Sequence, residues 1–465
     1  MSDMTMRVSA QLSQFGQAPL ARKAAILQAI YQQVAFSPSE IMYSMQYYAD
    51  GEIRPFTAQD FVGKTTLDTH VGKLQLDGPW DYLHGENAIT ASGLYLAAQA
   101  YRLKVGAEPE AVDEAARAFH SLERIFEMGV QAGMPGWMCK PYGFRPSNQT
   151  SPDQYLHACW GLYTYHAVAP SAHRRRIEDM IIAFADFWRH ADYVLTYFGN
   201  HWDQKNEPGY SNATMMLVNV LAYHFSGDPV YRCETEWFRE HQYWMQRSGV
   251  EELRRQYAEQ WRASGRVDAV PSGMPWVTPL LQPGETLLWE QACLCEFAAV
   301  AADVIHQLQP DLLGDSLPGL MAQWWRQGQY GIGDDLLPYY WFALDLVHDT
   351  WRPLPSTELA PREQWAFGDP LMGAVSQVRW CDPLARAMAA SVIAQRHVPA
   401  MAEQIRAQAT RLMDGTDATR LHWIVDPDGR QLLPEISYYG QCLSSEVPAT
   451  FLAAYWRGRL EGLWE

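Results

Sequence analysis

Residues 151–168, with the sequence SPDQYLHACWGLYTYHAV, decide the fold of this chain of 465 residues. Ser151 is a favourable N-cap, Pro152 suits the first helical position, and Gln154 follows three residues after the cap. Apolar side chains lie on nearly every side of the helix that follows, and such a helix belongs inside a protein. Yet Asp153 and His157 lie one turn apart on a shared face at its start. A buried helix with a polar first turn indicates that this end borders a cavity.

The same unit recurs along the chain: a nearly all-apolar helix, a short connection with a proline, and then an amphipathic helix. The prolines are Pro109, Pro170, Pro229, Pro310 and Pro399. The apolar helices are expected at residues 88–104, 152–168, 210–225, 285–306 and 382–396. In the first pair the amphipathic partner shows a stripe of helical period formed by Val112, Ala115, Phe119, Leu122 and Phe126. Short turns between such helices predict antiparallel hairpins.

Two further helices are expected near residues 20–34 and 334–348, the second with a less regular partner near 359–377. Buried helices alternating with half-buried ones predict two concentric rings, because an open solenoid has shorter and more regular repeats. We therefore expect an all-α fold, an (α/α)6 toroid of helical hairpins in one domain over residues 1–465, with the N-terminal region 1–78 packed onto it. Minor β-hairpins are expected in the long loops, at 40–78 and 418–438.

The long connections all lead into the apolar helices, at about 131–151, 190–209, 264–284, 350–380 and 415–446. Loops of that length in a compact protein usually carry function. They are expected to gather at one end of the toroid, above the N-termini of the inner helices. Those N-termini direct partial positive charge into the funnel, which favours carboxylates there. The topology thus predicts where a site lies.

The bulk composition excludes several classes of partner. The net charge of −17 disfavours binding to nucleic acid or to an anionic membrane surface. No apolar run approaches the length of a membrane span, and the first residues lack the pattern of a signal peptide. Seven scattered cysteines are best explained as free thiols in a reducing compartment, so we expect a cytoplasmic protein. The 19 Trp and 24 Tyr residues suit either a large helical core or a cleft for sugar rings.

Three segments resemble the six-hairpin glycosidase-like superfamily, which includes glycoside hydrolases, some polysaccharide lyases and sugar epimerases. These segments are residues 80–102, beginning WDYLHGENA, residues 143–146, GFRP, and residues 151–154, SPDQ. The resemblance covers roughly residues 80–230, with the helical periodicity continuing beyond. It implies the toroid fold, a carbohydrate substrate and a site in the funnel, but it matches no tandem catalytic signature of one hydrolase family.

Asp153 and Glu86 are the predicted catalytic pair, because glycosidic cleavage needs one carboxyl group as acid and a second as base or nucleophile. Asp153 is the first choice for the acid, because burial in its apolar helix is expected to raise its pKa. The alternative for each residue is a structural role at a helix end. His157 is the third catalytic candidate, since a hydrogen bond near Asp153 would fix its tautomer, although a lone helical histidine is more often a core residue.

Further polar and aromatic residues of the helix starts and loops are expected to bind the substrate. Arg145 either holds a substrate carboxylate or pairs with a loop acid. The whole set is Asp81, His84, Asn87, Tyr142, Arg145, Gln154, His201, Trp202, Asp203, Trp289 and Glu290. No metal is expected, because the pair His201 and Asp203 lacks further spaced ligands. No cofactor is expected either, since the chain has no glycine-rich phosphate loop and no HExxH helix.

The leading hypothesis is therefore an enzyme, a glycoside hydrolase acting on a small saccharide or glycoside. The first alternative is a sugar epimerase or isomerase, or a lyase, on the same toroid, with His157 or a tyrosine removing a ring proton and Arg145 binding a carboxylate. The second alternative is a non-catalytic carbohydrate-binding protein.

Overall fold

The computed structural model describes residues 12–49, 51–63, 76–106, 108–197, 200–205, 210–241, 259, 262–264, 281–282, 284–289, 291–339, 341–345, 347–348, 350–353, 379–425 and 440–465. Within these residues, no helix is both long enough and apolar enough to cross a membrane.

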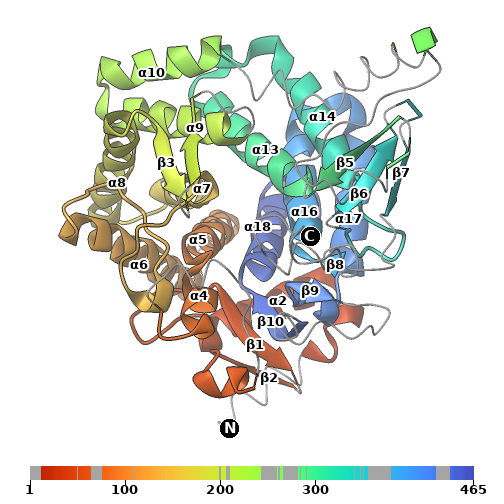
Figure 1. Cartoon of the computed structure of the whole chain (residues 1–465), viewed down its shortest axis with the longest axis horizontal. Helices are drawn as coiled ribbons and strands as arrows, with labels where there is room; N and C mark the ends of the chain where they lie inside the picture. The colour runs from red at the N-terminus through yellow and green to blue at the C-terminus, as the bar shows by residue number, and fades with distance from the viewer. Residues whose placement is uncertain are drawn as a thin grey trace.

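Six helices of the described chain form a closed inner ring (Figure 1). Each packs against the next in chain order, and the last returns to the first. They are α5 (Ala88–Val105), α7 (Pro152–His166), α9 (Tyr210–Ser226), α13 (Gln291–Leu308), α16 (Asp382–His397) and α18 (Glu446–Leu460). Helix α7 follows the sequence that predicted it: Tyr155, Leu156 and Trp160 are at most 1% exposed.

An outer helix packs against each member of the inner ring. Five of them directly follow their inner helix and make the predicted hairpins: α6 (Pro109–Gln131), α8 (Ser171–His190), α10 (Pro229–Glu240), α14 (Leu317–Gln329) and α17 (Ala402–Gly415). The sixth, α2 (Leu20–Val34), lies near the start of the chain and packs on α18 near its end. The two ends of the chain therefore close the toroid, and the (α/α)6 fold predicted from the sequence is confirmed.

The helix predicted at residues 334–348 is wrong. Part of this stretch forms strand β6 (Trp341–Asp345), which pairs antiparallel with β5 (Glu285–Trp289) and β7 (Thr350–Pro353). The aromatic run that includes Trp341 and Phe342 favours a strand, because such side chains pack well on a pleated surface. Strand β5 also occupies the start of the helix predicted at 285–306, so that helix begins only at Gln291.

Other predicted elements differ in smaller ways. The expected partner helix at 359–377 lies outside the described residues. In α6, Val112 is 45% exposed, and Ala111 takes its place in the buried stripe. The connection expected at 415–446 leads into helix α18, for which no range was predicted; this helix carries Pro448 and Gly458, which weaken a helical pattern.

Short strands join the loops on one face of the ring. A three-stranded sheet has the order β10-β1-β2, from Cys442–Ser444, Met45–Ala49 and Glu52–Arg54. A hairpin joins β3 (Val194–Tyr197) to β4 (Asn200–Asp203), and β8 (Arg379–Trp380) pairs with β9 (Ile424–Val425). Strands in 40–78 and 418–438 were expected, and the pairing of β1 with β10 ties the N-terminal region to the last loop.

Helices α5 and α7 approach each other closely at two glycines. A Cβ atom on Gly93 would lie 2.2 Å from the carbonyl oxygen of His157, and one on Gly161 would lie 2.4 Å from that of Gly93. Real Cβ atoms do not approach backbone so closely, so this contact requires glycine. The contact places the first turn of α7 directly beside α5. The six cysteines whose side chains are described are all free thiols, as expected.

Candidate functional site

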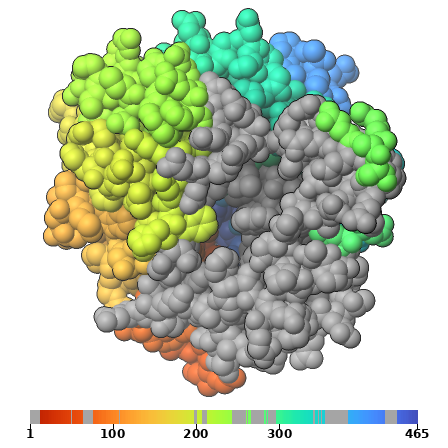
Figure 2. Space-filling view, turned by 45° about the horizontal axis from the view of Figure 1, so that its top comes forward, coloured from red at the N-terminus to blue at the C-terminus, as the bar shows by residue number. Residues whose placement is uncertain are grey.

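The first turns of the inner helices meet at the face of the ring that carries the long loops. Figure 2 shows this face with a central hollow, bordered on one side by the β3–β4 region and with C-terminal residues in blue at its floor. The first residue of α16 is Asp382, that of α18 is Glu446, and Asp153 lies in the first turn of α7. The carboxylates are thus placed where the helix N-termini favour negative charge.

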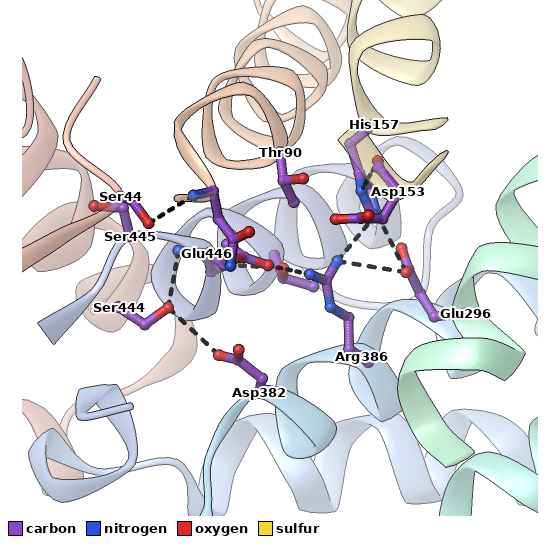
Figure 3. Close-up of polar contacts among 12 residues, drawn as sticks. Ser44, Thr90, Asp153, His157, Glu296, Asp382, Arg386, Ser444, Ser445 and Glu446 are labelled. Atoms are coloured by element: carbon purple, nitrogen blue, oxygen red, sulfur yellow. Dashed lines mark hydrogen bonds and ion pairs between the residues drawn. The ribbon is translucent and has the colours of Figure 1, made fainter. Parts of the chain in front are cut away.

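Arg386 lies at the centre of a buried polar cluster contributed by four inner helices (Figure 3). Its guanidinium group donates one hydrogen bond to His157 on α7 at 3.0 Å and contacts Glu296 on α13 at 3.4 Å. Its other terminal nitrogen donates to Glu446 on α18. Arg386 is 3% exposed, so these contacts take place away from bulk water. A guanidinium group suits this position because its donors point in several fixed directions.

The orientation of His157 follows from its two ring nitrogens. Nδ1 lies 2.9 Å from the carbonyl oxygen of Asp153, which can only accept, so Nδ1 carries a proton. Nε2 lies 3.0 Å from Nη1 of Arg386 and 3.3 Å from Oε2 of Glu296. In the neutral imidazole, the Nε2 lone pair therefore faces a cation. The expected hydrogen bond between Asp153 and His157 is present, and it is made by the main chain rather than by the carboxylate.

Two buried polar atoms near this cluster have no hydrogen-bond partner among the described residues. One is Oε1 of Glu296, and the other is the hydroxyl of Thr90, on α5. Both residues are fully buried. In Figure 3, Thr90 and Asp153 lie on the same side of Arg386. Because an unpaired buried polar group is costly, such atoms at the floor of a funnel are available to a ligand or to water.

Asp382 lies on the opposite side of Arg386 from Asp153 in Figure 3. The hydroxyl of Ser444 donates to its Oδ1 at 3.4 Å. Burial raises the pKa of Asp382 to about 6, although the charge of Arg386 acts in the other direction. This carboxyl group therefore holds a proton at mildly acidic pH, where an ordinary aspartate is ionised.

Asp153 has a contrasting environment. It is half-buried, and Oδ2 accepts a hydrogen bond at 2.9 Å from the side-chain amide of Gln154. The same amide nitrogen donates to Asn87 at 3.1 Å, and Oε1 of Gln154 accepts from the backbone N–H of Thr90 at 3.2 Å. Gln154 thus ties the first turn of α7 to α5 and orients Asp153, rather than completing a capping box with Ser151, whose side chain makes no cap hydrogen bond.

Glu86 follows the short helix α4 (Pro79–Gly85) and is held by two buried groups. The ammonium group of Lys140 forms an ion pair with Oε1, and the hydroxyl of Tyr142 donates to Oε2. Tyr142 in turn stacks on Tyr82 with ring centroids 5.5 Å apart. Both oxygens of Glu86 are therefore engaged, which favours a positioning role for it.

Asp81 and Arg145 form an ion pair next to this group. Nη2 of Arg145 donates to Oδ2 of Asp81 at 2.8 Å, and Nη1 lies 3.4 Å from Asp77. Gly143 has φ +58°, and a Cβ atom there would lie 2.6 Å from Oδ2 of Asp81, so this turn requires glycine. Of the two expected roles of Arg145, the structure shows pairing with loop acids.

His84 is buried between aromatic rings. Its ring stacks on Phe144 with centroids 5.6 Å apart and contacts Tyr43 edge-on at 4.9 Å. Burial lowers the pKa of His84 to about 4, with a partial offset from a hydrogen bond to the backbone of Phe56. His84 is therefore a neutral side chain at physiological pH, and its Nε2 has no partner among the described residues.

The remaining predicted residues lie at the rim or beyond the described side chains. His201 and Trp202 are exposed on β4, where His201 contacts the Thr196 hydroxyl at 3.1 Å, and Asp203 accepts from the backbone N–H of Lys205 at 3.0 Å. Trp289 ends β5, with its side chain not described, and Glu290 lies outside the described residues. Among the described residues, no group of three or more His, Cys, Asp or Glu side chains is arranged to hold a metal ion.

Four members of the central cluster were not predicted from the sequence: Glu296, Asp382, Arg386 and Glu446. A signal existed for two of them, because Asp382 and Arg386 repeat at the head of α16 the i, i+4 spacing of Asp153 and His157 in α7. Glu296 lies within an apolar helix, and Glu446 is the first residue of a helix for which no range was predicted. Lys140, the partner of Glu86, was also missed.

Comparison with known proteins yields structural likenesses alone. No protein-family model matches the chain, and no curated protein matches its sequence. A crystal structure of D-mannose isomerase is 12% identical, with a TM-score of 0.50 over 94% of this chain and 96% of that chain. An unsaturated glucuronyl hydrolase specific for heparin is 10% identical, with a TM-score of 0.44 over 99% of both chains. At 12% identity, the likeness to the D-mannose isomerase concerns the fold alone.

Proposed function

We propose that this protein is a carbohydrate-active enzyme, a glycoside hydrolase that cleaves a small saccharide or glycoside at the floor of the funnel. The observation that carries the proposal is the contrast between Asp382 and Asp153. Asp382 is buried and has a raised pKa, whereas Asp153 is half-buried and is not ion-paired among the described residues. Two carboxyl groups in different environments are the usual basis for dividing acid and base roles.

In the proposed reaction, protonated Asp382 donates its proton to the glycosidic oxygen as the bond to the anomeric carbon breaks. The carboxylate of Asp153 acts from the other side, either on a water molecule or on the anomeric carbon itself. Gln154 holds Asp153 in place through its amide. The guanidinium group of Arg386 forms ion pairs with Glu296 and Glu446.

This assignment differs from the pair expected from the sequence in two ways: Asp382 takes the place of Glu86, and Asp153 changes from acid to base or nucleophile. Both carboxylate oxygens of Glu86 are engaged, by Lys140 and by Tyr142, so we assign Glu86 a positioning role. We propose that Glu86 and its two partners form one wall of the substrate site. The exposed Trp202 at the rim adds a ring face on which a sugar can stack.

A second candidate is a sugar isomerase or epimerase, and His157 favours it. Its Nδ1 is fixed by the main chain, and its Nε2 lies between a guanidinium and a carboxylate, which suits a group that takes up and returns a proton. The D-mannose isomerase with the same fold acts, by its name, on a free sugar. In this reading, Arg386 stabilises the negative charge that develops on the sugar oxygen.

A panel of aryl-glycosides and small saccharides, set beside free aldoses and ketoses and followed by NMR, separates the candidates. We expect glycoside cleavage that falls by about 10²–10⁴-fold in Asp382→Asn and in Asp153→Asn. The control is Asp315→Asn, an exposed aspartate outside the inner ring, which should leave the rate unchanged.

Conversion of a free sugar without cleavage, lost in His157→Gln, would refute the hydrolase and support the isomerase. Saturable sugar binding without turnover on either panel would refute both and favour a binding protein.

A further inference from the structure

A pocket lies at the opposite end of the toroid from the candidate site. Its volume is about 280 Å³, and it is lined by residues from the C-terminal parts of five inner helices, α5, α7, α13, α16 and α18. The funnel residues occupy the first turns of these helices, so the pocket is separated from the funnel by the length of the inner ring. From Glu446 to Arg457 along α18 this is about 16 Å, at 1.5 Å per residue.

Three cationic side chains line this pocket: Lys104, Arg396 and Arg457. The ammonium nitrogen of Lys104 lies 5.5 Å from the centroid of the Tyr101 ring, and the guanidinium carbon of Arg457 lies 5.9 Å from the same centroid. The positive groups of Lys104 and Arg457 therefore both lie close to the ring of Tyr101. The hydroxyl-bearing side chain of Thr164 also lines the pocket.

Two carboxylates of this region pair with Arg457, and one of them, Glu461, lines the pocket and has an oxygen, Oε2, without a hydrogen-bond partner among the described residues. Arg457 is buried and pairs with Asp303 at 2.8 Å and with Glu461 at 2.9 Å. Among the residues that the structure describes, neither Lys104 nor Arg396 has a carboxylate within 4.0 Å.

The surroundings of Lys104 show that its charge is not compensated. Loss of water, and then the positive charge of Arg457, lower the pKa of Lys104 from its ordinary value. Basic residues in the last turn of a helix do stabilise the helix dipole. Stabilisation of the dipole explains why one cation lies at each helix end. It does not explain why the cations border a pocket, or why two of them lie over the same aromatic ring. In a chain with a net charge of −17, this concentration of positive charge is a local feature.

We propose that this pocket binds the phosphate group of a small molecule, independently of the reaction in the funnel. Phosphate carries up to two negative charges and presents oxygens in a tetrahedral arrangement, whereas a carboxylate presents two in a plane. Donors that approach from several helices around one pocket match the first geometry better. Lys104 and Arg396 would hold the phosphate oxygens at the rim, and Arg457, whose charge is matched by Asp303 and Glu461, would act as a hydrogen-bond donor at the floor.

Calorimetric titration of the full-length protein with inorganic phosphate tests this proposal, with succinate and chloride at equal ionic strength as comparison ions. We expect saturable binding of phosphate, weakened about tenfold or more in Lys104→Gln and in Arg396→Gln, which corresponds to the loss of one charge-assisted hydrogen bond. The matched control is Arg406→Gln, the same loss of charge at an exposed position on the outer helix α17, which should bind phosphate as the wild type does.

Lys104 and Arg396 are both exposed, so these variants should fold, and their thermal unfolding should match that of the wild type. Absence of saturable phosphate binding, or an equal dissociation constant in all three variants, would overturn the proposal. Succinate binding as tight as that of phosphate would overturn the assignment to a phosphate group.

Discussion

Replacement of Asp382 by Asn should make the protein more stable at neutral pH while it lowers the rate of turnover by about 10²–10⁴-fold. Burial raises the pKa of this carboxyl group from 3.8 to about 6. Each pKa unit corresponds to about 1.4 kcal/mol, so ionised Asp382 destabilises the folded state by about 3 kcal/mol above pH 6. An asparagine has nearly the same shape, carries no charge, and can still accept the hydrogen bond from Ser444. The asparagine variant therefore lacks this destabilisation of the folded state.

The sign of the effect follows from proton linkage. Between pH 4 and pH 6 the folded protein holds a proton on Asp382 that the unfolded chain has lost, so the stability of the wild type falls as the pH rises through this interval. The asparagine variant has no such dependence. The gap between the two proteins should therefore be small near pH 4 and reach its full size by pH 7.

Urea unfolding at several pH values between 4 and 7.5 measures this gap directly. The exposed Asp315→Asn should show no gap at any pH, and it serves as the control for a changed net charge. A gap that does not change with pH, or a variant that is less stable than the wild type at pH 7.5, would refute the raised pKa and with it the role of Asp382 as acid.

Three further substitutions test the framework around the site. Arg386→Met should lower the free energy of unfolding by about 3–5 kcal/mol, since it leaves buried carboxylates without a cation, and addition of Glu446→Gln should restore part of the loss. Burial alone would raise the pKa of Asp303, but Arg457 and His397 hold it well below its usual range. Asp303→Asn should therefore lower the free energy of unfolding by about 3–5 kcal/mol at neutral pH. Urea unfolding should show this loss shrinking below about pH 4, and a loss that stays constant there would contradict the lowered pKa. Gly93→Ala should lower the free energy of unfolding by about 2–3 kcal/mol, because the added Cβ would lie 2.2 Å from a backbone oxygen. The control is Gly106→Ala, where an added Cβ has no atom within 4 Å. A similar loss of stability in both variants would contradict the steric argument.

The sequence predicts the ring better than it predicts the loops. Inner helices such as α5 and α16 are apolar on all sides and end before a proline, and both signals are local in the sequence. Strands β5 and β6 form because they pair with each other across 51 or more residues, from Trp289 to Trp341 at the nearest. No local pattern carries that pairing, and the helix expected at 334–348 was wrong for this reason.

Carboxylates gather at the face of the ring that the topology predicted, but the sequence named only some of the residues that meet there. Asp153 and His157 were found because both lie on one helix, within a single turn. Their functional neighbours come from other helices: Arg386 is 229 residues from His157. Charged residues within apolar helices were available as a signal, since a buried charge requires a partner. What the sequence could not supply was the identity of each partner, which depends on the order of helices around the ring.

The closed ring also explains why the two candidate sites carry opposite charge. All six inner helices run in the same direction, so their N-termini share one face and their C-termini the other. Partial positive charge at the first face stabilises carboxylates such as Asp153, Asp382 and Glu446, and partial negative charge at the second stabilises cations such as Lys104 and Arg457. The helix dipoles offset the charge of these side chains only in part. The first face therefore keeps negative charge, and the second keeps positive charge, with which a ligand can interact. A neutral sugar whose transition state is cationic suits the first face, and a phosphate anion suits the second.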